Sequence, residues 1–160
     1  MATSCRFSVA VHVLTYMAWS DTDALKSDKL ALSVNTNPVV IRRLMCALSR
    51  AKLVTSQSGS TGGSRLARRP SHISLLDVYR AVEDAKAFGL HHRPPNRRCP
   101  IGREIETVLE DVLDRVDLAV ESTLARTTIA DVLQSMQCSF DKTFERTSDR
   151  TRVKAKSVAT

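Results

Sequence analysis

The side chains with the clearest chemical potential in this sequence are polar or cationic, and they gather between positions 35 and 43. An asparagine amide can pair with adenine, and an arginine guanidinium can bridge two acceptors of guanine or contact phosphate. The candidate DNA contacts of this segment are Asn35, Thr36, Asn37, Val39, Arg42 and Arg43. Because base edges and phosphates accept from the same donors, the segment predicts DNA binding without assigning one base to one residue.

The charge distribution favours a polyanionic partner. The 160 residues include 24 Lys and Arg against 17 Asp and Glu, a net charge of +7. No carboxylate lies between Asp28 and Asp77, an interval that carries Lys29, Arg42, Arg43, Arg50, Lys52, Arg65, Arg68 and Arg69. Residues 101–121, by contrast, hold 2 basic and 7 acidic side chains. Double-stranded DNA suits the basic region, while a solvated cationic face and a face that meets an acidic protein remain alternatives.

A second group of reactive side chains, His91, His92 and Cys99, lies in a segment with Gly89, Pro94 and Pro95. Histidine and cysteine bind zinc and serve as base and nucleophile in enzymes, but no fourth ligand has suitable spacing here. We therefore expect no catalytic residue, no metal site and no cofactor.

The four cysteines, Cys5, Cys46, Cys99 and Cys138, are widely spaced and form no C-x-x-C pair. This spacing favours reduced thiols over a disulfide framework. The sequence also contains no apolar stretch long enough for a membrane span and no secretory leader pattern. We expect a cytoplasmic protein that does not enter a membrane.

The candidate DNA contacts require a helical scaffold. Apolar residues at helical spacing predict a helix over about 4–19, and Ser27 is expected to cap a short helix through Leu32. Asn37 followed by Pro38 is a strong helix start, since Asn caps free amides and Pro at the first position loses no hydrogen bond. In the helix that follows, the residues predicted to face the core are Ile41, Leu44, Met45 and Leu48.

A glycine-rich segment over 59–63 separates two short stretches with strand character, 53–58 and 64–69, and predicts a β-hairpin. Gly62 and Gly63 are expected to allow positive φ in the turn, and Arg65 is the candidate minor-groove contact. The segment lacks the G-K-S/T ending of a phosphate-binding loop. Ser74 and Asp77 then resemble a capping box. Three helices, a hairpin and a further helix follow the order of a winged helix-turn-helix.

The second half of the chain predicts a different kind of element. Residues 84–100 are expected to form a connector, and 101–124 a long helix with an apolar arc too wide for one packing seam. This helix is expected to pack both on its own domain and on a second copy of the chain; the alternative is a helix buried wholly within one chain. Thr127 or Thr128 is expected to cap a short last helix. We divide the chain into a DNA-binding domain (1–83), the connector (84–100), the dimerisation region (101–140) and a mobile basic tail (141–160).

Several motifs occur in a recognisable order: S-V-N-T-N-P-V-V-I-R-R-L-M at 33–45, G-S-T-G-G-S-R-L-A-R at 59–68 and R-C-P-I-G at 98–102. From about Cys5 to about Leu133 the chain resembles the Rrf2 family of winged-helix transcriptional regulators, most closely its YwnA-type branch. The resemblance implies a mainly α fold with a small β-hairpin and a long C-terminal dimerisation helix. It also implies a homodimer, more often a repressor, on an inverted-repeat operator.

The sequence departs from this family at two places. Iron–sulfur members carry three cysteines in the loop before the long helix, where this chain has only Cys99, so the resemblance does not imply a cluster. Val40 and Arg42 stand where many relatives have Tyr and Glu. The mode of DNA contact therefore transfers from the family, but the operator sequence does not.

Cys99 is the candidate redox-sensing residue. It directly precedes Pro100 at the expected start of the long helix and follows Arg97 and Arg98, an environment that favours the thiolate. Oxidation is expected to change the spacing of the two recognition helices and to release DNA. Cys138 is a candidate disulfide partner within or between chains. An inert Cys99, or a small ligand held between wing and long helix, are the alternatives.

Overall fold

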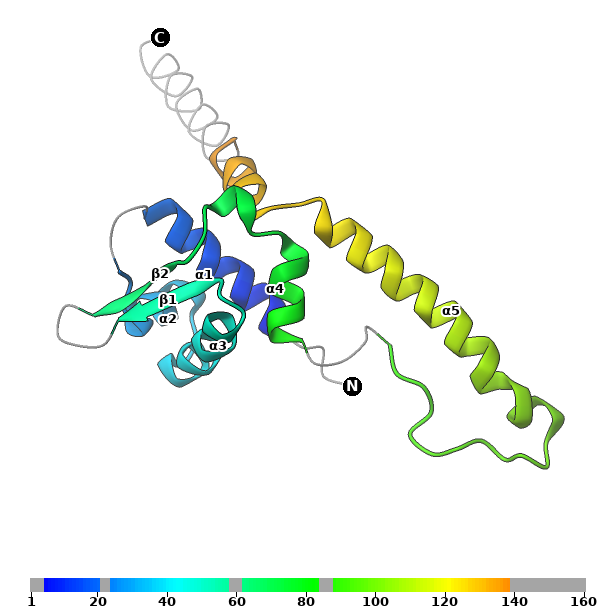
Figure 1. Ribbon diagram of the computed structural model, residues 1–160. Helices are drawn as coiled ribbons and strands as arrows, with labels where there is room; N and C mark the ends of the chain where they lie inside the picture. The colour runs from blue at the N-terminus through cyan, green and yellow to red at the C-terminus, as the bar shows by residue number, and fades with distance from the viewer. Residues whose placement is uncertain (1–4, 21–23, 58–61, 84–87, 139–160) are drawn as a thin grey trace, which may run out of the picture.

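The computed structural model describes residues 5–20, 24–57, 62–83 and 88–138 (Figure 1). The helices are α1 (Arg6–Ser20), α2 (Ser27–Val34), α3 (Pro38–Arg50), α4 (Leu75–Val82) and α5 (Pro100–Ala125), with a short 3-10 helix at Pro70–His72. The strands β1 (Val54–Gln57) and β2 (Gly63–Leu66) form an antiparallel hairpin, and a last helix covers 129–138. These elements confirm a mainly α fold with a small β-hairpin.

One hydrophobic core joins α1 to α4 with the hairpin and the start of the last helix. Its side chains are almost all aliphatic, as a sequence with 4% aromatic residues requires. The largest fully buried residues are Leu14, Leu30, Ile41, Leu48, Leu53, Ile73 and Ile129. The core-facing stripe of α3 is confirmed, because Ile41, Leu44, Met45 and Leu48 are all buried.

The two helices of the helix-turn-helix begin differently. Asn37 caps α3 as predicted, since its Oδ1 accepts a hydrogen bond from the Val39 amide at 2.8 Å. The expectation that Ser27 caps α2 is wrong, because Lys26 occupies the cap position and makes no side-chain cap bond. The cause is tertiary: Leu25 exchanges backbone hydrogen bonds of 2.8 and 2.9 Å with Ser64 of β2, which keeps the chain extended up to Lys26.

The hairpin pairs Val54 with Leu66 and Gln57 with Gly63, so its strands are shorter than predicted. Gly63 lies in extended strand backbone, and the expectation of positive φ there is wrong. Glycine is required at this position for space, because a Cβ would lie 2.6 Å from the carbonyl carbon and oxygen of Ala24. β2 therefore approaches the segment before α2 at backbone distance.

Two matching caps join the last helix to the core. The capping box of Ser74 and Asp77 is confirmed at the start of α4. Of the two threonines proposed to cap the last helix, Thr128 has this role, and it forms the same reciprocal pattern with Asp131. The Ile129 amide also donates to the Ile73 carbonyl at 2.9 Å. The start of the last helix is therefore anchored to the start of α4.

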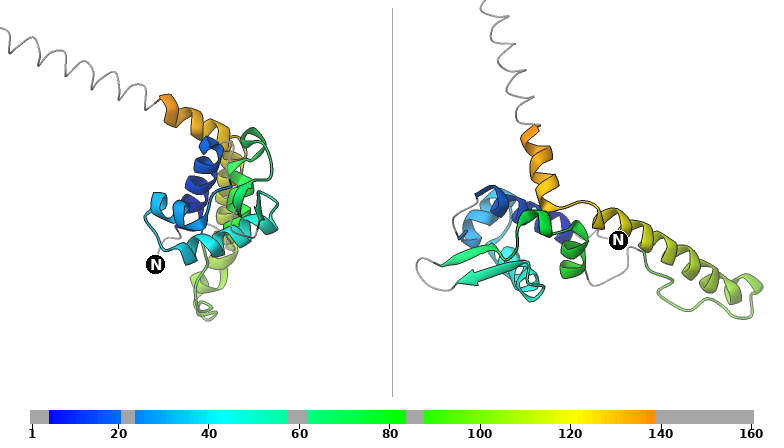
Figure 2. Two further views of the ribbon diagram at one scale, coloured as in Figure 1. Left: turned by 90° about the vertical axis from the view of Figure 1, so that its left-hand side faces the viewer. Right: turned by 45° about the horizontal axis from the view of Figure 1, so that its top comes forward.

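Helix α5 extends away from the part of the protein that contains the core, and only its C-terminal part lies beside α4 (Figures 1 and 2). Arg80 of α4 forms an ion pair of 2.7 Å with Glu121 at that end. None of the 26 residues of α5 is buried, and Ile101 and Val108 are 70% and 57% exposed. Burial of this helix within one chain is therefore wrong. Within the described residues, no helix is long and apolar enough to cross a membrane.

Candidate nucleic-acid interface

Helix α3 presents one face to solvent beside the hairpin. Val39, Arg42 and Arg43 are exposed on this face, and Val40 and Cys46 accompany them. The amphipathic pattern fixes this orientation, because the aliphatic residues between them fill the core. The helix therefore offers the guanidinium groups of Arg42, Arg43 and Arg50 and a small apolar surface to a ligand.

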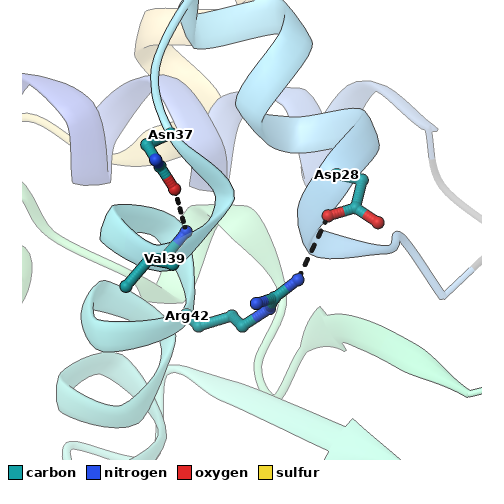
Figure 3. Close-up of polar contacts among 4 residues, drawn as sticks. All are labelled: Asp28, Asn37, Val39 and Arg42. Carbon is teal, nitrogen blue, oxygen red and sulfur yellow. Dashed lines mark hydrogen bonds and ion pairs between the residues drawn. The ribbon is translucent and has the colours of Figure 1, made fainter.

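The residues of the turn before α3 also stabilise the backbone of the helix-turn-helix. Asn35 ends α2 in the left-handed region with φ of 57°, a conformation that asparagine tolerates better than most residues. Thr36 is half-buried, and its amide donates to the Ala31 carbonyl at 3.0 Å. Asn37 uses its side-chain oxygen for the cap (Figure 3), which leaves its NH₂ group as the donor suited to phosphate or a base edge.

The guanidinium group of Arg42 forms an ion pair with an acidic residue of α2. Its Nη2 lies 3.3 Å from Oδ1 of Asp28, a residue in the first turn of α2 (Figure 3). The two side chains are 60% and 70% exposed, so the pair contributes no more than about 1 kcal/mol. Sequence reasoning missed Asp28 as a partner of the candidate site. The available signal was its position as the last carboxylate before the long basic interval.

A groove of about 550 Å³ runs between α3 and the hairpin. Its α3 side includes Arg42 and Arg50, and its strand side includes Ser56 and Ser64, whose hydroxyls lie 2.9 Å apart. Arg65 is exposed on β2 opposite Thr55. Cationic groups thus line one wall and hydroxyl groups the other, an arrangement suited to a sugar–phosphate backbone. Sequence reasoning had not placed Arg50, Ser56 or Gln57 at this groove.

Cys99 lies far from this groove, at the start of α5 (Figure 1). It is exposed and occupies the N-cap position without a side-chain cap bond, while its amide donates to the Asn96 carbonyl at 3.0 Å. Gly102 permits this tight return of the loop, since a Cβ there would lie 2.5 Å from the Asn96 carbonyl oxygen. The structure therefore explains the R-C-P-I-G motif as a loop that folds back on the first turn of α5.

A disulfide between Cys99 and Cys138 of one chain is wrong for this structure. The two residues lie beyond opposite ends of α5, whose 26 residues span about 39 Å. A disulfide requires Cα atoms within about 7 Å. A bond between two chains remains a prediction.

The loop before α5 does not fit an iron–sulfur cluster held by three thiolates, because Cys99 is its single cysteine. His91 lies 3.9 Å from the Glu106 carboxylate, so its nearest acidic neighbour is on α5. In the described part of the chain, no three His, Cys, Asp or Glu side chains gather in a geometry that could hold a metal ion.

Comparison with known proteins identifies the family of this fold. The family model named Rrf2, described as an iron-dependent transcriptional regulator, matches residues 3–135. The chain belongs to the Rrf2 family. It is 38% identical over 131 residues to YwnA of Bacillus subtilis (strain 168), which is named as an HTH-type transcriptional regulator, and the match covers 82% of this chain and 96% of YwnA.

Solved structures of similar proteins agree with this membership. A DNA binding protein is 37% identical with a TM-score of 0.65, covering 80% of this chain and 98% of its own. A transcriptional regulator from Lactobacillus plantarum has 25% identity and a TM-score of 0.71, covering 91% and 97%. The cysteine regulator CymR of B. subtilis shares the fold at 19% identity and a TM-score of 0.62, covering 84% and 98%.

Family membership establishes the class of activity. This Rrf2 member is a DNA-binding transcriptional regulator with a winged helix-turn-helix, and its relative YwnA is named as an HTH-type transcriptional regulator. The family description names iron, whereas the loop before α5 of this chain carries a single cysteine, Cys99, rather than the three thiolates described above.

Proposed function

We propose that the protein acts as a homodimeric repressor of an inverted-repeat operator. Each α3 enters a major groove with Arg42, Arg43 and Asn37, and each hairpin places Arg65 near the adjacent minor groove. The observation that carries this proposal is the exposed cationic face of α3 beside the hydroxyl-lined groove of the hairpin. Phosphate contacts along that groove supply affinity, while base contacts from α3 supply sequence preference.

The uncovered apolar surface of α5 supports a dimer. Apolar side chains recur along one side of this helix, and Ile101, Val108 and Val112 on that side are exposed. Two such helices packed side by side would remove this surface from water, which is the main driving force of association. The twofold axis would then set the distance between the two α3 helices, as an inverted repeat requires.

Selection of bound fragments from a genomic library, followed by salt titration, tests this proposal. The selected duplex should bind much more tightly than a scrambled duplex of the same length, and its affinity should fall steeply with salt. Arg43→Gln should reduce the slope of log affinity against log salt by about one. Arg103→Gln removes the same charge from α5, away from α3 and from the apolar side of α5, and should leave the slope unchanged.

Equal, weak binding of the selected and scrambled duplexes would contradict the regulator proposal. A steep slope that Arg43→Gln leaves unchanged would place the phosphate contacts elsewhere on the basic surface. Repression itself is tested by placing the selected site in a promoter, where the protein should lower reporter expression.

A further inference from the structure

A second cavity lies away from the DNA-facing groove, between α1, the end of α2 and the last helix at 129–138. Its volume is about 680 Å³, within the range of about 300–1,000 Å³ typical of small-molecule sites. Its walls are mainly apolar and aromatic, with Phe7, Val11, Tyr16, Trp19, Leu133 and Met136 among the lining residues. Tyr16 and Trp19 stack with ring centroids 5.8 Å apart.

The polar groups of this cavity are few and specific. His12 Nε2 and Ser33 Oγ share a hydrogen bond of 2.9 Å at its wall. Thr15 also lines the cavity, is 3% exposed, and has a hydroxyl with no hydrogen-bond partner among the described residues. An apolar chamber with a small number of convergent polar groups is the usual composition of a ligand site.

The charge beside the cavity favours an anion at its Tyr16 end. No Asp or Glu belongs to the lining, and Lys29, which lies outside the lining, has its Nζ 6.0 Å from the centroid of the Tyr16 ring. The Glu83 carboxylate accepts a hydrogen bond of 3.2 Å from the amide of Phe7, nine residues before Tyr16 along α1. Aromatic walls of this kind accept a flat or branched hydrocarbon body. A molecule that combines such a body with one carboxylate or sulfonate would complement both features.

The cavity is also connected to the DNA-contacting segment. Ser33 lies in the last turn of α2, two residues before Asn35, where the chain turns toward α3. A ligand that competes for the hydrogen bond between His12 and Ser33 would act directly on this turn. The cavity therefore has a short structural route to the candidate DNA contacts.

We propose that this cavity binds a small organic acid with an apolar, ring-sized body, and that its occupancy weakens DNA binding through Ser33. The second part rests on the proposed function, whereas the first part does not. The occupant is a small molecule rather than the apolar side of α5 from a second copy, because the buried Thr15 hydroxyl has no hydrogen-bond partner among the described residues and an apolar helix side would supply none.

Energy transfer from Trp19 to 1-anilinonaphthalene-8-sulfonate tests the site on the full chain. Trp19 is the single tryptophan of the sequence and lies in the cavity wall, so bound probe should quench its emission. Ser8 lines the cavity and is exposed. The phenyl ring of Ser8→Phe should fill part of the cavity and lower probe affinity by about tenfold. Gln134→Phe adds the same ring to an exposed position of the last helix outside the lining and should bind within twofold of wild type.

The charge preference is tested with the uncharged analogue N-phenyl-1-naphthylamine. The sulfonate probe should bind more tightly than the analogue, and Lys29→Gln should abolish that difference. Met136→Glu adds a negative charge to the cavity wall, the same sign as the sulfonate. It should lower the affinity for the sulfonate probe and leave the affinity for the uncharged analogue within twofold. Circular dichroism of each variant verifies folding.

Several results would overturn the site. One is wild-type energy transfer that Ser8→Phe and Met136→Glu both leave unchanged. Another is probe binding that disappears as the protein associates, which would show that a second copy fills the cavity. Equal binding of the charged and uncharged probes would refute the organic acid as the ligand class.

Coupling is measured separately by titrating the selected duplex with and without saturating probe. Bound probe should lower the affinity of the protein for the duplex by a factor within about 5–150. By linkage, bound duplex should lower the affinity for the probe by the same factor. Ser33→Ala should reduce this factor, whatever its effect on probe affinity, because it removes the hydrogen bond through which the ligand acts on the turn. A protein that binds probe but no duplex contradicts the proposed function alone, whereas duplex affinity that is indifferent to bound probe refutes the coupling.

Discussion

Arg42 extends from the exposed face of α3 and forms its ion pair with Asp28 of α2. Asp28 neutralises one of the charges that phosphate would attract, and it also holds the guanidinium at a defined place. Asp28→Asn should therefore raise the affinity for DNA of any sequence and lower the ratio between the selected and scrambled duplexes. Fluorescence anisotropy with both duplexes measures this ratio.

The control for that substitution is Asp111→Asn, which removes the same charge from α5. If Asp111→Asn raised DNA affinity as much as Asp28→Asn, the effect would come from net charge and not from the pair with Arg42. A combined Asp28→Asn and Arg42→Gln variant should lose most of the gain in affinity, because the two residues act as a unit.

Cys99 remains the candidate redox sensor, with an exposed thiol at the start of α5. Mild oxidant should weaken operator binding by the wild-type protein and leave Cys99→Ser unaffected, because serine cannot follow the same oxidation. Affinity for the selected duplex before and after treatment measures the effect. Equal responses of the two proteins, or no response while mass spectrometry shows a modified Cys99, would remove this residue as the sensor.

Among the elements, α2 and α3 offer a matched test of helix capping. Asn37 makes the side-chain cap of α3, whereas Ser27, at the start of α2, makes none. Asn37→Ala should lower the free energy of unfolding by about 1 kcal/mol, and Ser27→Ala should change it by a few tenths at most. Urea denaturation followed by circular dichroism measures both values. Equal losses would contradict the assignment of the caps.

The last helix has a pH-dependent anchor. Hydrogen bonds from the Thr128 hydroxyl and amide lower the pKa of Asp131 below its ordinary value. The pKa of Asp131 is lower in the folded protein than in the unfolded chain, where it is about 4. The stabilisation of the folded state by the Asp131 carboxylate is therefore complete above the unfolded pKa, and it is lost as the pH falls through the folded pKa. Helix 129–138 should therefore fray in acid.

An NMR titration of the Asp131 carboxyl carbon checks this expectation. Its midpoint should lie below that of an unstructured aspartate, and Thr128→Val should move the midpoint upward by removing the hydroxyl donor. Gln137→Ala, a substitution at an exposed position later in the same helix, should leave the midpoint in place. An ordinary midpoint in the wild-type protein would contradict the capping arrangement.

For the whole molecule, the proposed assembly depends on α5. Val112→Asp would place an unpaired charge in the apolar interface, at a cost of several kcal/mol if that site is buried in the dimer. Dimerisation and operator binding should fall together, as measured by sedimentation equilibrium and anisotropy. Thr107→Asp introduces the same charge at an exposed position on the polar side of α5 and should change neither.

A wild-type protein that is monomeric at micromolar concentration, yet binds a full palindrome tightly, would contradict this assembly. Weakened DNA binding by Val112→Asp without a change in oligomeric state would also contradict it, because the effect would then reach the DNA site by another route.

Features that depend on neighbouring residues were predictable from the sequence. The cap at Asn37-Pro38, the capping box of Ser74 and Asp77 and the core stripe of α3 each involve partners within about two turns of the chain. Capping residues and helical periodicity can be recognised directly in the order of the residues, because they involve positions close together in the sequence. The order of these elements indicated the winged helix-turn-helix, and the motifs at 33–45, 59–68 and 98–102 carried the resemblance to the family that the comparison confirmed.

Other features depended on segments that meet only after folding. Lys26 displaces Ser27 as the cap of α2 because Leu25 pairs with β2, and Gly63 is needed because β2 approaches Ala24. The pair of Asp28 with Arg42 and the cavity beside His12 likewise join separate elements. Such contacts leave no periodic signal in the sequence, because the distance between their partners along the chain is set by packing rather than by helix or strand geometry.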